Sequence, residues 1–276
     1  MDLGLTGKTV IVTGASGGIG RGLVQAFADE SCNVVLASRD EAKCEEVAAT
    51  CENRPGKTRV VQTDVTDTNS VSALLAKTEQ AFGAVDVLVN NAGGVAYPRV
   101  WEEKPADEIQ WEIDLNVLGV VNCTNAIGAT MIERGAGSIV NITSNSALEP
   151  SAGNMVANYA GTKGYVMSMS KALAYEWGPK GVRINCVSPG WIVPWEEEHV
   201  GEGSFWRKYG YEFFGTPEQM AAAAEGEGDM FNVQGQPIRR IGRPEDIADA
   251  SLFLASERAK HLTGQLISVS GGAYMP

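Results

Sequence analysis

Tyr159 and Lys163 are the residues whose types and spacing most directly suggest chemistry. They lie four positions apart in a stretch with helical character, so both side chains are expected on one helix face. A free tyrosine has a pKa of about 10, too high for a base at neutral pH, but a nearby ammonium group favours the phenolate. The pair could therefore exchange a proton with a substrate oxygen. Alone, the spacing is a weak signal, because many such pairs lie on solvated helix faces.

Three further polar features are expected near this pair. Ser144 ends the apolar run 138–143, and the segment 90–93 (Asn-Asn-Ala-Gly) ends another such run. Asn116 lies among leucine and valine residues in a helix predicted at 107–133. A polar side chain in such an apolar stretch suggests a specific structural or functional role. The carboxyl ends of parallel strands meet where ligands bind in open α/β sheets. The sequence therefore predicts one site that gathers these residues.

A glycine-rich turn follows the first predicted strand and opens a predicted helix. Glycines at 14, 18 and 20 allow a tight turn, close approach of a pyrophosphate and close helix–strand packing. Backbone N–H groups at the helix N-terminus then face the anion. A turn that binds nothing is the alternative, but the strand–turn–helix context favours a dinucleotide site. The residues assigned to the cofactor here are Gly14, Ser16, Gly17, Gly18, Ile19 and Gly20.

Residues after the second predicted strand indicate which dinucleotide is bound. An acid there would bond the ribose hydroxyls of NAD(H), whereas an arginine accommodates the 2′-phosphate of NADP(H). This chain has Ser38 and then Arg39, whose planar guanidinium suits a phosphate. Asp40 leaves alternatives open, because it could pair with Arg39 or cap the next helix. We expect NADP(H) to be favoured over NAD(H).

Short β-branched runs alternate with longer helical patterns along the whole chain. Strands are predicted at 8–13, 33–37, 59–62, 85–90, 138–143, 182–187 and 265–269, and helices at 19–29, 41–51, 70–82, 107–133, 154–177 and 244–255. The strand runs are almost continuously apolar, as in parallel strands buried on both faces. This alternation predicts an α/β fold: a single-domain, Rossmann-type, doubly wound parallel sheet of about seven strands with helices on both faces.

Composition excludes several other classes. The formal net charge of −12 disfavours nucleic acid and anionic membranes as partners. No stretch of 18 apolar residues predicts a membrane span, and the first residues do not resemble a signal peptide. The five cysteines lack CxxC spacing and there are two histidines, so we expect reduced thiols, a cytoplasmic location and no metal site.

The segment 195–237 breaks the strand–helix alternation. It contains nine acidic and eight aromatic residues and is expected to be a substrate lid, since long insertions are often functional. Its aromatics suggest a bulky, cyclic or aromatic substrate, although at least half of them are expected to pack the lid or form a subunit contact. Arg207 and Lys208 could meet a carboxylate or a CoA phosphate. The substrate-binding residues predicted are Ser146, Trp191, Trp195, Phe205 and Trp206.

Taken together, these motifs resemble those of the short-chain dehydrogenase/reductase family over nearly the whole chain. The matching pieces are the TGxxxGxG loop, Asp64-Val65, the NNAG segment, Asn116, NITS ending at Ser144, YxxxK, Ser188-Pro189-Gly190, the segment 242–248 and Leu262-Thr263-Gly264. The series as a whole is far more specific than any one of its motifs.

The resemblance implies a role for each matching residue. Tyr159 would be the general acid/base, Lys163 would lower its pKa and hold the nicotinamide ribose, Ser144 would polarise the substrate oxygen, and Asn116 would anchor a water in a proton relay. Tyr159 and Lys163 are also predicted to contact the cofactor, and the other contacts that the resemblance implies are Asp64, Val65, Asn91, Ala92, Gly93, Pro189, Gly190 and Ile192. Family members usually form tetramers or dimers through helices such as that at 154–177, so we expect a homo-oligomer, a tetramer rather than a dimer.

The chain departs from the family pattern at three places. Ser144 precedes Tyr159 by fifteen residues, where the family usually has thirteen, and Ser146 has the usual separation. We keep Ser144, because the intervening loop can absorb two residues. After the Pro-Gly pair, family members often have a threonine that hydrogen-bonds the nicotinamide carboxamide, but here the segment ends in Pro194. The backbone of Ile192 or Val193 would then have to make this hydrogen bond. Ser270 stands where an aspartate is common.

The expected reaction is reversible hydride transfer between a nicotinamide cofactor and a ketone or secondary alcohol. One alternative is a 3-hydroxyacyl- or 3-oxoacyl-CoA-type thioester dehydrogenase/reductase. A second is a cofactor-sensing binding protein, which would bind the dinucleotide without turnover. A metal-dependent alcohol dehydrogenase is disfavoured, because the cysteines and histidines lack zinc-site spacing.

Overall fold

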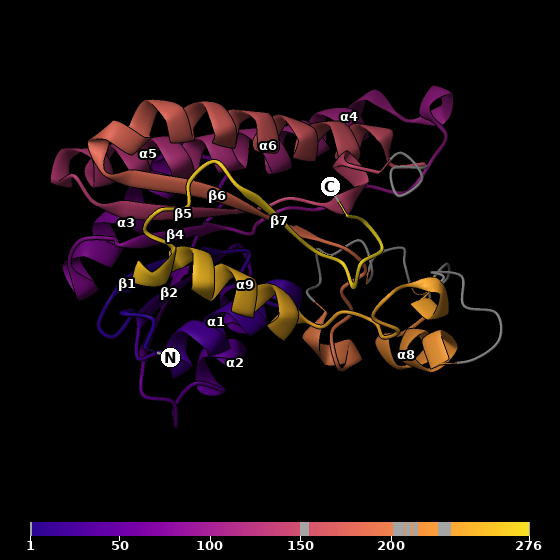
Figure 1. Ribbon diagram of the computed structural model, residues 1–276, viewed down its shortest axis with the longest axis horizontal. Helices are drawn as coiled ribbons and strands as arrows, with labels where there is room; N and C mark the ends of the chain where they lie inside the picture. Colours follow the sequence, from indigo (N-terminus) through magenta and orange to yellow (C-terminus); the bar gives the residue numbers. More distant parts are fainter. Residues whose placement is uncertain are drawn as a thin grey trace.

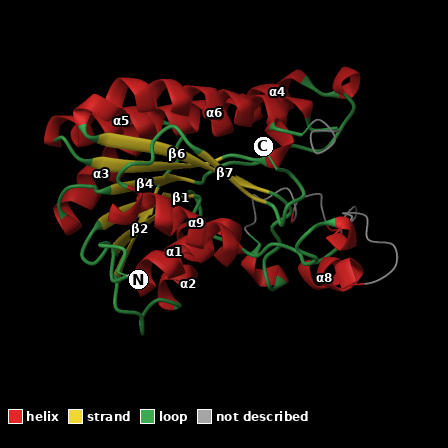
Figure 2. Ribbon diagram, viewed as in Figure 1, coloured by secondary structure: helices red, strands yellow, loops and turns green. Residues whose placement is uncertain are grey.

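A parallel sheet forms the centre of the molecule. The computed structural model describes residues 2–149, 155–200, 207, 211, 215–225 and 233–275. In this part of the chain the strand order is β3-β2-β1-β4-β5-β6-β7, with every neighbouring pair parallel (Figure 2). The strands are β1 (Thr9–Thr13), β2 (Asn33–Ser38), β3 (Lys57–Gln62), β4 (Val87–Asn90), β5 (Gly137–Ile142), β6 (Val182–Pro189) and β7 (Leu266–Val269). The predicted single-domain, doubly wound sheet is confirmed.

Helices cover both faces of this sheet (Figure 1). The described α-helices are α1 (Gly18–Asp29), α2 (Glu41–Ala49), α3 (Thr68–Phe82), α4 (Ala106–Ile113), α5 (Gly119–Arg134), α6 (Ala157–Trp177), α8 (Pro217–Glu225) and α9 (Pro244–Ala255), of which α8 lies apart from the sheet. One hydrophobic core joins α1, α2 and α9 to the sheet, and a second joins α3, α5 and α6 to the opposite face. The fold therefore has three layers.

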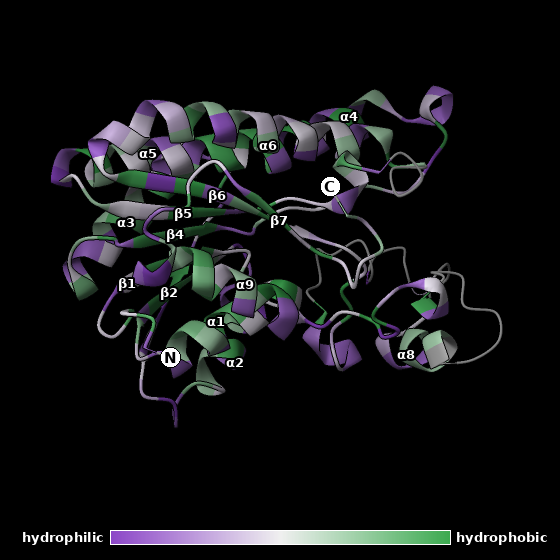
Figure 3. Ribbon diagram, viewed as in Figure 1, coloured by the Kyte–Doolittle hydropathy of each residue, from purple (hydrophilic) through white to green (hydrophobic). Residues whose placement is uncertain are grey.

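Alternation within the strands explains why their sequences are so apolar. Val10 and Val12 of β1 pack into the first core, whereas Ile11 between them packs into the second. Each is fully buried, so both faces of the strand need apolar side chains. In Figure 3 the central strands are drawn largely in the hydrophobic colour, with a hydrophilic segment in β6, whereas the helices combine hydrophobic and hydrophilic residues.

The connections place the switch in strand order beside β1. The chain runs outward from β1 to β2 and β3, and then returns to β4 on the other side of β1. Ligands in open α/β folds bind at the carboxyl ends of the strands at such a point. The glycine turn after β1 and the Asn-Asn-Ala-Gly segment after β4 both lie there.

One predicted helix is interrupted in the structure. The sequence predicts a helix at 107–133, and the chain is helical from Ala106 to Arg134, but residues Asp114–Leu118 form a π turn between α4 and α5. The stretch 106–134 is long and apolar enough to cross a membrane, but the buried core helices of soluble proteins meet the same criterion. Here α5 packs against α3 and the sheet, with Cys123, Ile127 and Met131 fully buried.

The predicted lid segment is described only in part. Residues 201–206, 208–210, 212–214 and 226–232 lie outside the described residues, and Phe205 and Trp206 are among them. Around α8 a small separate core is formed by Val193, Met220, Ala224, Val233 and Ile241. Val193 and Ile241, which lie just before and just after the segment 195–237, thus pack against Met220 and Ala224 of α8.

Candidate active site

The glycine turn joins β1 to α1 with very little space inside it. A Cβ at Gly20 would lie 2.1 Å from the carbonyl oxygen of Gly14, and Gly14 and Gly18 have positive φ angles of 65° and 51°. Outside the turn the space is open, since no heavy atom lies within 4 Å of a Cβ placed at Gly18. Gly17 occupies the N-cap of α1 without a side chain to cap it, so the first N–H groups can face an anion. This geometry fits a pyrophosphate.

Asn91 fixes this turn to the end of β4. Its side-chain amide donates to the carbonyl oxygens of Thr13 (2.9 Å) and Gly14 (3.1 Å). The Thr13 hydroxyl in return accepts from the backbone N–H groups of Asn91 and Ala92, each at 3.0 Å. Asn91 and Ala92, both predicted cofactor residues, therefore hold the backbone of the glycine turn in place.

Residues at the end of β2 resolve one open question about Arg39. Asp40 caps α2 by accepting from the backbone N–H of Lys43 at 3.0 Å, so its carboxylate serves the helix. Arg39 is exposed, and the Ser38 hydroxyl donates to Ser16 in the glycine turn at 3.1 Å. The pKa of the Asp64 carboxyl lies below its ordinary value. Burial alone would raise this pKa, but hydrogen bonds from Thr66 and the positive charge of Arg39 lower it. Arg39, Ser38 and Asp64 therefore lie around one end of the turn, where the adenosine half of a dinucleotide is expected.

Val65, the other predicted adenine contact, packs beside α5. Its side chain would lie 2.7 Å from a Cβ at Gly119, and its carbonyl oxygen accepts from Asn122 at 3.0 Å. Ile19, at the first turn of α1, packs partly into the core. Val65 and Ile19 therefore help to pack α5 and α1 against the rest of the fold, in addition to their predicted contacts with the cofactor.

Tyr159 and Lys163 lie one turn apart near the start of α6, as their spacing predicts. The Lys163 ammonium donates to the carbonyl oxygen of Ile142 at 3.0 Å and lies 5.7 Å from the centre of the Tyr159 ring. Burial raises the pKa of Tyr159 to about 12, the charge of Glu112 adds to the rise, and a hydrogen bond with Ser144 opposes it. Burial lowers the pKa of Lys163 to about 8.

These shifts differ from the sequence-based expectation that Lys163 lowers the pKa of Tyr159. Removing a phenolate and an ammonium from water disfavours both charged forms. For Tyr159, burial and the charge of Glu112 outweigh the hydrogen bond with Ser144, so its pKa lies above the ordinary value. In the protein itself the phenol is therefore protonated at neutral pH and suited to donate a proton.

Ser144 and Ser146 both reach the site. Their hydroxyl oxygens lie 2.7 Å apart, and Ser144 caps the short turn Asn145–Ala147 by accepting from the backbone N–H of Ser146 at 3.2 Å. The turn brings the two hydroxyls together, so the spacing to Tyr159 does not force a choice between them. Ser144 is the one that bonds the phenol.

Asn116 is held at the π turn. Its side-chain oxygen accepts from the Gly94 N–H at 2.9 Å, and its amide donates to the Gly94 carbonyl at 2.8 Å. The residue is fully buried. A π turn inside an α-helix often marks a functional position. These bonds supply the reason for a polar residue in an apolar helix.

Comparison with known proteins places this geometry in a family. Residues 8–197 match the family described as short chain dehydrogenase, and residues 213–274 match one described as enoyl-(acyl carrier protein) reductase. This chain is a short-chain dehydrogenase/reductase. Members of the family are oxidoreductases that use NAD(P), and the cleft described above fits such a cofactor.

Characterised relatives span almost the full length of the chain. It is similar to L-fucose dehydrogenase of Bos taurus, with 37% identity over 97% of this chain and 89% of the relative. It is also similar to a 3-oxoacyl-acyl-carrier-protein reductase of Thermotoga maritima, with 32% identity over 97% of this chain and 98% of the relative. A solved short-chain dehydrogenase/reductase from Mycobacterium marinum superimposes with a TM-score of 0.82 at 29% identity, covering 100% of this chain and 98% of that one.

The short-chain dehydrogenase/reductase cleft continues along the end of β6. Pro189 ends this strand, and a Cβ at Gly190 would lie 2.9 Å from the Ser270 backbone, so the two segments touch closely. Ile192 forms a parallel bridge with Gly242. In this bridge the Val193 N–H donates to the Gly242 carbonyl oxygen at 3.0 Å, so of the two backbone positions predicted to replace the missing threonine, Ile192 is the one whose N–H is not used by the bridge.

Trp191 and Trp195, both predicted substrate residues, are partly exposed beyond this bridge. Their exposed fractions are 39% and 55%. Trp195 stacks on the Arg243 guanidinium at 4.0 Å and donates to the Glu245 carboxylate at 3.2 Å. Trp195 is therefore attached to the start of α9, and the substrate-binding roles of Trp191 and Trp195 stay predictions.

Three potential metal ligands gather near the start of the lid. Atoms of Glu196, Glu198 and His199 lie within 4.8 Å of one another, and each carboxylate is 3.7 Å from the His199 ring. Both glutamates are exposed. Pairing with His199 accounts for the cluster without an ion.

Gly93 separates two of the predicted catalytic side chains. A Cβ at this position would lie 2.9 Å from Asn116 Oδ1 and 2.9 Å from Lys163 Nζ. We expect Gly93→Ala to displace both groups and to lower kcat by about 10- to 100-fold. Gly178→Ala is the matched control, because no heavy atom lies within 4 Å of its Cβ. Turnover equal in the two variants would contradict this placement.

Two buried charged residues beside the site, Lys104 and Glu112, are not among the residues predicted from the sequence. Glu112 lies four residues before Asn116, on the same helix face, and this spacing was the available signal. Lys104 lies four residues before Glu108 and eight before Glu112, but it precedes the start of α4, so helical spacing alone does not indicate this pairing.

Proposed function

We propose that this protein interconverts a secondary alcohol and a ketone by hydride transfer, with NADP(H) favoured over NAD(H). The observation that carries the proposal is the cluster of Ser144, Tyr159, Lys163 and Asn116 beside the glycine turn. The cofactor, when bound, supplies or accepts the hydride. The chain provides the proton, holds the oxygen and shields the reacting atoms from water.

Tyr159 is proposed to exchange the proton. In reduction its phenol donates to the carbonyl oxygen as negative charge develops there, while the Ser144 hydroxyl donates a second hydrogen bond to the same oxygen. In the oxidation of an alcohol the phenolate accepts the proton. Lys163 provides a positive charge beside the phenol and a donor for the ribose. Asn116, which holds the Gly94 backbone, is proposed to anchor a water of a proton relay.

The proposed preference for NADP(H) rests on Arg39. Capping of α2 by Asp40 leaves the guanidinium free to meet a 2′-phosphate. We expect Arg39→Asp to change the NADPH/NADH ratio of kcat/KM by about 10-fold or more towards NADH, because a charge-assisted bond is replaced by repulsion. Arg59→Asp, an exposed change of the same charge on β3, is the control. An unchanged ratio would show that Arg39 does not read the phosphate.

A bulky cyclic or aromatic substrate is proposed from the aromatic residues of the lid. Similarity to a protein named L-fucose dehydrogenase is compatible with a ring-bearing substrate, and similarity to a 3-oxoacyl-acyl-carrier-protein reductase keeps the thioester alternative open. Initial rates with matched cyclic ketones, aliphatic ketones, free acids and CoA thioesters separate the two. Cofactor binding without turnover on every compound would favour the binding-protein alternative.

We also propose a cytoplasmic homo-oligomer, a tetramer rather than a dimer. Tyr165 and Tyr175 on α6 and Leu118 before α5 are exposed by 50%, 88% and 45%, which gives these helices an apolar outer surface. All five cysteines are buried and free, as suits a reducing compartment. Light scattering after size exclusion measures the assembly, and a monomer would contradict this proposal.

A further inference from the structure

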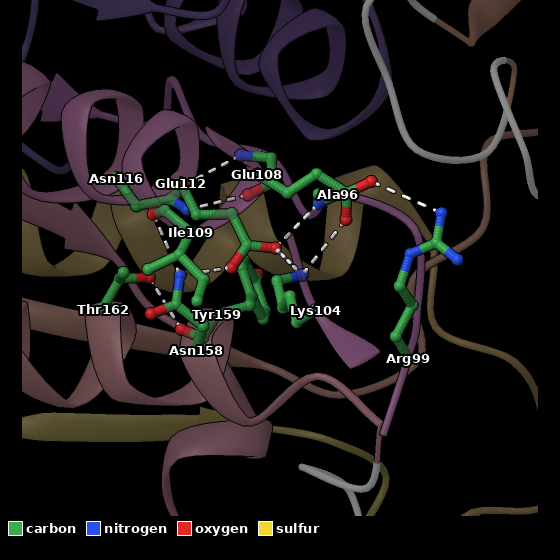
Figure 4. Close-up of polar contacts among 11 residues, drawn as sticks. Ala96, Arg99, Lys104, Glu108, Ile109, Glu112, Asn116, Asn158, Tyr159 and Thr162 are labelled. Carbon is green, nitrogen blue, oxygen red and sulfur yellow. Dashed lines mark hydrogen bonds and ion pairs between the residues drawn. The ribbon is translucent and has the colours of Figure 1, made fainter. Parts of the chain in front are cut away.

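Glu112 is a buried carboxylate that joins three segments of the site (Figure 4). One of its oxygens accepts from the backbone N–H of Ala96 at 2.8 Å and from the Lys104 ammonium at 3.0 Å. Its other oxygen accepts from the Asn158 amide at 2.6 Å. Both carboxylate oxygens are thus bonded within the protein, and the side chain has no exposed surface.

Lys104 is buried as deeply as its partner. Its side chain is 1% exposed and also lies 3.9 Å from Glu108, which in turn pairs with Arg99 at 3.5 Å. A buried ion pair is expensive to desolvate and often stabilises no better than an apolar pair of the same size. Stability alone is therefore a poor explanation for this arrangement.

The place of the pair in the fold connects it to the proton-transfer residues. Asn116, one turn further along the helix, holds Gly94 through two hydrogen bonds, while Glu112 holds Ala96 of the same loop. Asn158, the third partner of Glu112, directly precedes Tyr159 and also donates to the Ile109 carbonyl at 3.2 Å. Glu112 therefore sets the position of the start of α6 relative to α4 and to the loop after β4.

Charge is the second consequence of this position. Within the described residues, two charged groups act on Tyr159, namely Glu112 from α4 and Lys163 from α6, whose ammonium lies 5.7 Å from the centre of the ring. Behind Glu112, the network continues through Lys104 and Glu108 to Arg99, and the Cys186 thiol of β6 interacts with Lys163. Among these, Glu112 raises the pKa of Tyr159, since a negative charge disfavours a phenolate. Lys104 offsets that negative charge at 3.0 Å.

We propose that Glu112 and Lys104 are positioning residues for Tyr159, which together fix the start of α6 and balance the charge beside the phenol. This inference rests on the proposed function, in which Tyr159 exchanges the substrate proton. Neither residue contacts the reacting atoms. They act through Asn158 and through the electric field at the phenol.

Two substitutions that change the charge near the Tyr159 phenol in opposite directions test the proposal. Glu112→Gln keeps the size and an acceptor oxygen but removes the negative charge, so the phenolate becomes easier to form. The rising limb of the pH profile for alcohol oxidation should move to lower pH by about half a unit or more. Lys104→Met leaves the carboxylate without its cation and should move the same limb to higher pH. Asp107→Asn, an exposed change on α4, should leave the limb unmoved.

A structural role alone would lower the unfolding temperature and kcat without moving this limb, and that result would overturn the proposal. If Lys104→Met does not fold, the double variant Lys104→Met/Glu112→Gln should return the limb to near its wild-type position. Carbon-13 NMR of the tyrosine ring carbons, with Tyr159 identified by its loss in Tyr159→Phe, follows the phenol without turnover. Absence of wild-type turnover would defeat the proposed function, whereas an unmoved Tyr159 signal in Glu112→Gln would defeat this inference.

Discussion

Tyr159→Phe is expected to lower kcat for ketone reduction by about 100- to 10,000-fold, the usual contribution of a positioned general acid. The change removes one oxygen and leaves the ring in place beside Lys163. The carbonyl oxygen would then lose its proton donor while Ser144 still donates a hydrogen bond. The protein should remain folded and should bind the dinucleotide about as tightly as before, because the glycine turn lies on other elements.

The matched control is Tyr165→Phe. Tyr165 lies on the same helix but is 50% exposed, so loss of its hydroxyl should leave kcat unchanged. Single-turnover rates with saturating NADPH measure the chemical step, and quenching of tryptophan fluorescence measures cofactor binding. Turnover of Tyr159→Phe within threefold of the wild type would remove Tyr159 from the proton-transfer step.

Lys163→Met is expected to have the second largest effect. Its ammonium lies 5.7 Å from the centre of the Tyr159 ring, and it is proposed to hold the nicotinamide ribose as well. We expect kcat/KM to fall by about 100-fold or more, through weaker cofactor binding and a slower proton transfer together. Lys171→Met on the same helix is the control, since Lys171 is exposed. Equal kinetics in the two variants would contradict the role given to Lys163.

The wild-type pH profile tests Lys163 without a substitution. Burial lowers its pKa to about 8, so the ammonium is present below that pH and is lost above it. The Tyr159 phenol, with a pKa of about 12, stays protonated throughout this range. The rate of ketone reduction should therefore be level near pH 7 and fall above about pH 8. A rate that stays level to pH 10 would show that the Lys163 charge is not needed.

Local sequence patterns predicted the fold because each strand carries its own information. The run of Val10, Ile11 and Val12 by itself predicts a strand that is buried on both faces, and no information about neighbouring strands is needed. The glycine turn is similar, since the positive φ of Gly14 and the contact at Gly20 arise within a few residues. Strand ends therefore agree closely with expectation, and the site residues at those ends lie in the region that the sequence indicated.

What the sequence could not supply depends on distant contacts. The π turn at Asn116 forms because Gly94, 22 residues away, bonds both ends of its amide. The direction of the Tyr159 pKa shift depends on how deeply α6 is buried, which the YxxxK spacing does not contain. The pairing of Lys104 with Glu112 likewise requires the folded loop. Phe205 and Trp206 stay predictions, as they lie outside the described residues.

The most direct test of the central claim is the initial rate of nicotinamide absorbance change with the purified protein. NADPH and NADH would each be offered with the panel of cyclic, aromatic and aliphatic ketones and thioesters, for wild type and Tyr159→Phe side by side. We expect the wild type to oxidise the cofactor with at least one ketone, faster with NADPH than with NADH, and the variant to lose this turnover almost completely. Turnover that is equal in the two proteins would contradict it.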